Sequence, residues 1–317
     1  MNTKTRIATL SLNPAIDHTA RISSFTAGRV NRVEWEQADA GGKGVNVASF
    51  LADAGLPVAA TGLFGNGNIE PFVELFEHKG IEDHCVRLPG RTRVNVKITD
   101  PVLDQVTDIN FPGLSPRPED LTQLHRTLDA LCEDTDWFVL SGSVPAGVSS
   151  GIYGSLVERL KQRGKRVLLD ASGEPLALAV KCDPDIIKPN IDELGELVGQ
   201  ELKSPAEVLV AAKSLVASGI GLVAVSMGAE GAMFVEAGAA LLALPPKIEV
   251  KSTVGAGDAM VAGILVGGLR GLELDRRARL ATAFSLAALG EVGPNLPAMS
   301  VVESFAARVE IHTLANH

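Results

Sequence analysis

A glycine-rich loop followed by a carboxylate is the segment of this sequence best suited to chemistry. The stretch STVGAGDAMVAG occupies residues 252–263, and Asp258 directly follows Gly255, Ala256 and Gly257. Backbone N–H groups at the start of a helix can bind an anion, and small side chains let a phosphate group approach them closely. A carboxylate at the same place can accept a proton from a hydroxyl that attacks the phosphate. We therefore interpret Asp258 as a candidate general base beside an anion hole.

Other interpretations of this loop have to be weighed. Taken alone, the loop is equally compatible with a helix cap, which would contribute about 1 kcal/mol to stability. A dinucleotide-binding loop needs a third glycine where Met260 stands, and this loop comes too late in the chain for the second half of such a domain. The sequence contains no GxxxxGK[ST] motif, which excludes a P-loop. The choice between cap and anion hole therefore needs a second feature.

A second glycine loop supplies that feature. The stretch ADAGGKGVNVASFLADAG, residues 38–55, also runs from glycines into a helical pattern, with Lys43 in the loop and Asn46 on the first turn. A turn, a helix cap and a solvated lysine would account for it without any ligand. Two such loops in one acidic protein instead favour two phosphate-bearing ligands.

The elements that position these loops alternate along the chain. Helical patterns cover residues 45–54, 121–131, 153–162 and 204–219, and the last has a capping box formed by Ser204 and Glu207. This alternation predicts a parallel sheet covered on both faces. Polar residues end four successive strands, at Ser141, Asp170, Lys188 and Ser226, where open α/β sheets bind their ligands. The predicted strands are residues 7–12, 58–65, 137–141, 166–170, 185–188 and 222–226.

Two segments, residues 18–40 and 91–113, depart from this pattern and alternate polar with apolar residues. We interpret them as antiparallel ribbons that together form a small lid. In RVNVKI the period of two predicts one polar face, with Arg93, Asn95 and Lys97, and one apolar face, with Val94, Val96 and Ile98. A ribbon this small must be buried against something, so the apolar face predicts contact with the same ribbon of a second chain.

Composition excludes several classes of protein. The net charge of -9 and the aromatic content of 4% do not suit a nucleic-acid-binding protein. No run of about 18 apolar residues suggests a membrane span, and the N-terminal stretch reads as a first strand and its loop rather than a signal peptide. The cysteines Cys85, Cys132 and Cys182 lie far apart, which favours a reduced, cytoplasmic protein.

The two glycine loops together resemble the signatures of a known family. AGGKGVNVA and STVGAGDAMVAG are similar to those of the PfkB branch of ribokinase-like sugar kinases, and KPNIDE and VSMGAEGA resemble its N-x-x-E element and nucleotide loop. The resemblance spans the chain and implies one α/β kinase domain over residues 1–317, a three-layer α/β/α fold with a mostly parallel central sheet and a small β-sheet lid formed by about 13–40 and 87–112. TLSLNPAIDHTA, GRTRVNVKITD and VTDINFPG resemble most closely the members that phosphorylate fructose 1-phosphate with ATP.

The resemblance also implies roles for individual residues. The catalytic group would be Asp258, with Gly255, Ala256 and Gly257 as the anion hole. Mg²⁺ would be organised through water molecules by Asn190 and Glu193. The sugar phosphate would contact Asp17, Arg29, Gly41, Gly42, Lys43, Asn46, Arg93 and Ser141. The nucleotide would contact Lys188, Asn190, Glu193, Ser226, Met227, Gly228, Ala229, Glu230, Gly231, Ser252, Thr253 and Gly257.

Two alternatives remain open at this point. A kinase of the same family acting on fructose 6-phosphate or tagatose 6-phosphate would have the same loops. A non-catalytic regulator that binds sugar or nucleotide would share the fold, although it would have no need of a base at position 258. The family also implies a homodimer that is joined through the lids.

Overall fold

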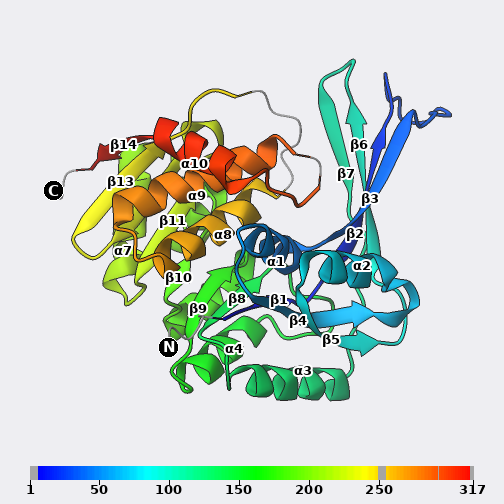
Figure 1. Cartoon of the computed structure of the whole chain (residues 1–317), viewed down its shortest axis with the longest axis horizontal. Coiled ribbons are helices and arrows are strands. Elements are labelled where there is room, and N and C mark those ends of the chain that lie inside the picture. Colours follow the sequence, from blue (N-terminus) through cyan, green and yellow to red (C-terminus); the bar gives the residue numbers. More distant parts are fainter. Residues whose placement is uncertain (1–5, 249–254, 292, 315–317) are drawn as a thin grey trace.

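The computed structural model describes residues 6–248, 255–291 and 293–314, and its strands form two separate sheets. The larger sheet has the order β14-β13-β12-β11-β10-β9-β8-β1-β4-β5 (Figure 1). Its strands pair in parallel from β11 to β5, and β12, β13 and β14 extend one edge in antiparallel fashion. The strands are β1 (Ile7–Ser11), β4 (Val58–Gly65), β5 (Glu82–Leu88), β8 (Trp137–Ser141), β9 (Arg166–Asp170), β10 (Ile186–Ile187), β11 (Leu222–Ser226), β12 (Ala232–Glu236), β13 (Ala239–Leu244) and β14 (Glu310–Thr313).

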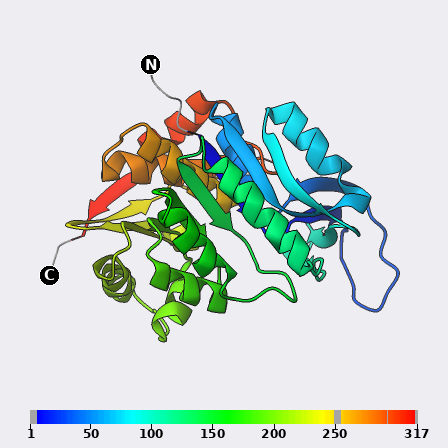
Figure 2. The ribbon, with the colours of Figure 1, turned by 90° about the horizontal axis from the view of Figure 1, so that it is seen from below.

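Helices cover both faces of this sheet, as Figures 1 and 2 show. Side chains of each strand alternate between two cores, so that Ile7 packs into one and Ala8 into the other. These layers confirm the expected three-layer α/β/α fold. One core is closed by α1 (Lys43–Asp53), α2 (Glu70–Lys79), α8 (Ala256–Leu269), α9 (Leu274–Leu289) and α10 (Met299–Arg308), and the other by α3 (Pro118–Leu131), α4 (Ile152–Lys161), α5 (Gly173–Ala179), α6 (Ile191–Val198) and α7 (Pro205–Ala217).

The second sheet, which we call the small sheet, stands away from the main body (Figure 1). It has the order β3-β2-β6-β7, with β2 (Ala15–Arg21) and β3 (Trp35–Gly41) forming one hairpin and β6 (Arg93–Asp100) and β7 (Gln105–Ile109) the other. The two hairpins join through a parallel pairing of β2 with β6, which the sequence pattern did not predict.

The apolar face of β6 differs from the expectation. Val94 packs against the core of the main body and Ile98 is buried within the chain, so neither needs the cover of a second chain. Only Val96 remains half-exposed without belonging to a core. The reason is that the parallel pairing with β2 places Val94 beside the buried Ile16 at the base of the small sheet.

Most element boundaries lie within two residues of the prediction. The capping box of α7 is confirmed, since Ser204 Oγ accepts from the Glu207 N–H and Glu207 accepts from the Ser204 N–H. Strand β10 is shorter than predicted, because Pro189 follows Lys188 and cannot donate to the ladder. In the described part of the chain, no helix is long and apolar enough to cross a membrane.

Candidate active site

Polar residues gather where the parallel strands end. Strands β8, β9, β10 and β11 are neighbours in the sheet, and Ser141 at the end of β8 lies opposite Asp170 at the end of β9. Lys188 follows β10, and Ser226 ends β11. The four strand ends that the sequence singled out therefore meet at one edge of the sheet.

The two glycine loops converge on this edge. Gly255, at φ 78°, precedes α8 in a left-handed conformation that favours glycine, and Ala256 and Gly257 form the first turn with Asp258. Asp258 is buried, and its Oδ2 accepts a hydrogen bond of 2.8 Å from Nδ2 of Asn46 on α1. Residues 212 positions apart in the sequence thus share one buried contact.

Two lysines share one oxygen of Asp170. Nζ of Lys43 lies 3.3 Å and Nζ of Lys188 lies 3.4 Å from Asp170 Oδ1. Lys188 also lies beside the glycine loop that precedes Asp258, since a Cβ on Gly257 would be 3.5 Å from the Lys188 Nζ. The other oxygen, Asp170 Oδ2, is buried and has no hydrogen-bond partner among the described residues. The sequence signalled Asp170 as a strand end, but its place between the lysines was not predicted.

Burial and neighbouring charges set the ionisation of this group of residues. Burial, followed by the charge of Asp170, raises the pKa of Asp258 to about 7, although Lys43 acts in the opposite direction. Burial alone would lower the pKa of Lys43, but the carboxylates of Asp170, Asp258 and Glu193 raise it above its usual value. Lys43 therefore stays charged, and Asp258 can gain or lose a proton near neutral pH.

The base of the small sheet borders the same edge. Oδ1 of Asp17 accepts 3.0 Å from Nδ2 of Asn95, and burial raises the pKa of Asp17. Arg93 uses all its guanidinium nitrogens on carbonyl oxygens: Nε donates to Pro14, Nη2 to Asn13 and Nη1 to Phe111. Burial lowers the pKa of Arg93. A guanidinium has five N–H donors, so Arg93 keeps donors for a ligand.

Two glycines allow the chain to pass close to these residues. A Cβ on Gly41 would collide with Asp17 Oδ2, and a Cβ on Gly42, at φ 108°, would lie 2.9 Å from Pro14 Cα. Ser141 is another candidate for the sugar-phosphate side of the site. It is buried, and its Oγ has no hydrogen-bond partner in the described chain. Its carbonyl oxygen accepts from Tyr153 Oη at 3.0 Å, a contact that sequence reasoning did not identify.

The candidate nucleotide residues lie on the other side of Lys188. Asn190 and Glu193 form a reciprocal capping box at the start of α6, each accepting from the other's backbone N–H at 2.8 Å. Asn190 also pairs with Ser226 in an isolated parallel bridge. The loop after β11 closes on itself through the Met227 N–H and the Gly231 carbonyl oxygen, and it contains the exposed residues Gly228, Ala229 and Glu230.

Some predicted residues are not brought to this site. Arg29 lies in the exposed loop between β2 and β3, at the end of the hairpin far from the main body (Figure 1). Its recorded contacts are local, to Thr26 and Asn31. Ser252 and Thr253 lie outside the described residues.

The residues present fit a magnesium ion bound mainly to phosphates and water. Among the described residues, no group of three or more His, Cys, Asp or Glu side chains could hold a metal ion. Mg²⁺ usually keeps several waters and takes one or two carboxylates plus substrate phosphates. The unpartnered Oδ2 of Asp170 and the carboxylate of Glu193, whose charge acts on Lys43, could supply these ligands.

A buried carboxylate on the first turn of a helix that follows a glycine-rich loop, with two lysines near it at the carboxyl edge of the parallel sheet, is typical of small-molecule kinases. Comparison with known proteins agrees with this class. The model of the pfkB family carbohydrate kinases matches residues 10–300, and the chain belongs to this family.

Individual relatives are similar over nearly the whole chain. The chain is 52% identical to a 1-phosphofructokinase of Rhodobacter capsulatus, with 98% of each chain covered. It resembles the structure of a possible 1-phosphofructokinase from Thermotoga maritima at a TM-score of 0.89 and 27% identity, covering 98% of this chain and 100% of that one. It also resembles phosphofructokinase-2 from Escherichia coli in complex with fructose-6-phosphate, at a TM-score of 0.87 and 27% identity, covering 96% and 99%.

Proposed function

We propose that this protein transfers the terminal phosphoryl group of ATP to fructose 1-phosphate and forms fructose 1,6-bisphosphate. The observation that carries the proposal is Asp258, buried at the start of α8, held by Asn46 and close to two lysines. The names of the relatives support fructose 1-phosphate as the substrate. The enzyme would act in the cytoplasm, which suits its free cysteines Cys85, Cys132 and Cys182.

Each part of the transfer has a residue or loop of this site that supports it. Asp258 accepts the proton of the C6 hydroxyl as the oxygen forms its bond to the γ-phosphorus, and the bond from that phosphorus to the β–γ bridging oxygen breaks to release ADP. N–H groups of Gly255, Ala256 and Gly257 stabilise the charge that develops on the moving phosphoryl group. A pKa of about 7 allows Asp258 to be ionised before the reaction and still accept a proton during it.

The remaining residues bind and orient the two substrates. Asp17, Gly41, Gly42, Asn46, Arg93 and Ser141 would hold the sugar phosphate, and Lys43 would lie between the two substrates. Asn190, Glu193 and the loop of residues 226–231 would hold ATP beside Lys188. Bound Mg²⁺ would neutralise charge on the phosphates, with Asn190 and Glu193 organising its water molecules and Asp170 supplying a further oxygen.

We also propose that two chains pair through their small sheets. Large exposed apolar side chains concentrate there, and among the described residues only Val210 and Val301 lie elsewhere. Apolar patches of this kind mark protein contacts. The large exposed apolar residues of the small sheet and its loops are Val30, Val33, Trp35, Val102, Leu103, Val106, Ile109 and Phe111. In such a pair Arg29 would lie within the contact region, and its role in binding substrate stays a prediction.

The function is tested with purified protein, Mg·ATP and three sugar phosphates. We expect the highest kcat/KM with fructose 1-phosphate, compared with fructose 6-phosphate and tagatose 6-phosphate. Preference for one of the other two would make the protein a different kinase of the family, and no turnover with any would indicate a binding protein.

The Asp258→Asn variant tests the base. Asparagine caps a helix about as well as aspartate, so the fold should persist while kcat falls by roughly two to four orders of magnitude. Asp275→Asn is the matched control, because Asp275 occupies the exposed first turn of α9. Wild-type turnover in the Asp258 variant would mean that this residue is only a cap.

A further inference from the structure

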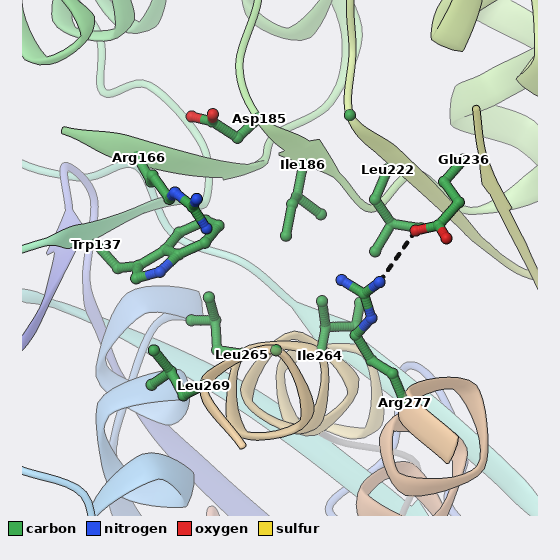
Figure 3. A pocket seen from close by; sticks show the side chains of 12 residues that line it. Trp137, Arg166, Asp185, Ile186, Leu222, Glu236, Ile264, Leu265, Leu269 and Arg277 are labelled. Carbon is green, nitrogen blue, oxygen red and sulfur yellow. Dashed lines mark hydrogen bonds and ion pairs between the residues drawn. The ribbon is translucent and has the colours of Figure 1, made fainter. Parts of the chain in front are cut away.

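A cavity of about 310 Å³ lies at the opposite end of the parallel strands from the candidate active site (Figure 3). Its wall is formed by residues that begin strands, and by the last turns of α8. Ile264, the wall residue of α8 nearest the active site, lies six residues beyond Asp258, about 9 Å along the helix axis at 1.5 Å per residue. Trp137 and Arg166 lie at the opposite ends of β8 and β9 from Ser141 and Asp170. The cavity is therefore separate from the site at the start of that helix. The strand residues are Trp137, Arg166, Ile186 and Leu222, and the helix residues are Ile264, Leu265, Gly268 and Leu269.

The central walls of the cavity are apolar. Side chains of Ile186 and Leu222 reach in from the sheet, and Ile264 and Leu265 face them from α8 (Figure 3). Gly268 leaves additional room, since a Cβ there would meet nothing within 4 Å. The volume is at the lower end of the range for small-molecule sites.

Charged groups lie on two sides of this apolar part of the cavity. On one side the Arg166 guanidinium lies over the Trp137 ring, 5.4 Å from its centroid. On the other, Arg277 Nη2 pairs with Glu236 at 3.0 Å. The stem of Arg277 packs on Gly267, where a Cβ would lie 2.9 Å from Arg277 Cγ, so the guanidinium is held in place.

The charges around the cavity do not cancel. Glu236 is paired with Arg277, and Asp185 is paired with Lys161 at 3.0 Å and accepts from the Val167 N–H. Within the described ranges, Arg166 has no ion pair, and its ring contact with Trp137 does not neutralise its charge. The positive charge of Arg166 thus borders an apolar space.

We propose that this cavity is a second ligand site, which takes a small organic anion with an aromatic or branched apolar body. Its carboxylate or phosphate would bind Arg166 at the edge of the cavity, and its apolar part would lie between the sheet and α8. Arginine suits both head groups, because its planar fork matches either one. A sugar phosphate has no apolar part, so the site is not a second copy of the sugar-phosphate site.

Trp137 offers a direct readout of binding. The chain has two tryptophans, so Trp35→Phe leaves Trp137 as the only indole. In this background we would titrate phenyl phosphate and benzoate while following indole fluorescence. Benzyl alcohol has the ring without the charge, and inorganic phosphate has a charge without the ring. The proposal expects saturable changes with the two aromatic anions, weaker binding of benzyl alcohol and no response to phosphate.

Two variants locate the binding. Arg166→Met should weaken both anions about tenfold, because a charge-assisted contact is lost. Its control is Arg270→Met, which removes an exposed arginine at the end of α8 outside the cavity and should change nothing. Gly268→Leu should abolish binding by filling the cavity, and leucine favours the helix over glycine.

Several outcomes would overturn the proposal. Absence of saturable binding, equal binding of benzyl alcohol, or unchanged binding in the Gly268 variant would each do so. Displacement of the probe by ATP or fructose 1-phosphate would place it in the active site instead. Asp258→Asn separates the two proposals, since its loss of turnover should leave probe binding intact.

Discussion

At the scale of residues, Asp170 connects the groups around Asp258. It is 1% exposed and forms ion pairs with two lysines through one oxygen, and its charge helps to raise the pKa of Asp258. Such a carboxylate acts on the base from a distance, through charge and through the lysines that it holds. Its removal should therefore change how the base titrates.

The pH profile of kcat/KM tests this connection. Asp258 works as a base only when ionised, so kcat/KM should fall as pH decreases below about 7. In Asp170→Asn a negative charge is lost and the lysines become free to stabilise the Asp258 carboxylate. Both changes lower the pKa of Asp258, and the acid limb should move to lower pH. Asp275→Asn should leave the limb in place. An unmoved or raised limb in the Asp170 variant would contradict the assignment.

Arg93 supports a second residue-scale prediction. Its nitrogens donate to Asn13, Pro14 and Phe111, which a single lysine nitrogen cannot reproduce. Arg93→Lys should raise KM for the sugar phosphate by about tenfold or more and leave KM for ATP nearly unchanged. Arg91→Lys, at an exposed neighbouring arginine, is the control. Equal increases in both KM values would show that Arg93 does not belong to the sugar side.

At the scale of elements, local signals explain which parts of the structure could be predicted. The glycine loops, the Ser204 cap and the strand ends are each encoded within a few residues, and all appear where expected. Features that depend on distant partners were missed. The parallel pairing of β2 with β6 and the bridging place of Asp170 arise only after the chain has folded. The cavity near Trp137 could not be predicted for the same reason, because strands that are distant in the sequence supply its wall.

The packing of α8 supplies an element-scale prediction. A Cβ on Gly263 would lie 2.7 Å from Ala281 Cα, so the close contact of α8 with α9 requires glycine there. Gly263→Ala should destabilise the protein by about 1–3 kcal/mol and, by shifting the helix that carries Asp258, lower kcat. Gly268→Ala in the same helix has open space and should stabilise by about 0.5–1 kcal/mol. Urea unfolding compares the two, and equal stability would disprove the packing argument.

At the scale of the whole molecule, the small sheet carries apolar surface that the chain itself does not cover. Ile109 on β7 is 45% exposed, and Trp35 on β3 is 44% exposed. The sequence placed the contact on Val94, Val96 and Ile98, of which the chain already buries Ile98 and packs Val94 against its core. The surface available to a second chain is therefore the neighbouring strands and loops.

Light scattering of matched variants decides whether these surfaces join two chains. The wild type should be a dimer at micromolar concentration, because a two-fold contact buries the same apolar patch twice. Ile109→Asp should shift it toward monomer, since a charge buried in an apolar contact is costly. Val210→Asp, on α7 and 67% exposed, adds the same charge elsewhere and should remain dimeric.

The base of the small sheet also borders the sugar side through Asp17, so the Ile109 variant should show a raised KM for sugar phosphate as it dissociates. A wild-type monomer with full activity would rule out the pairing.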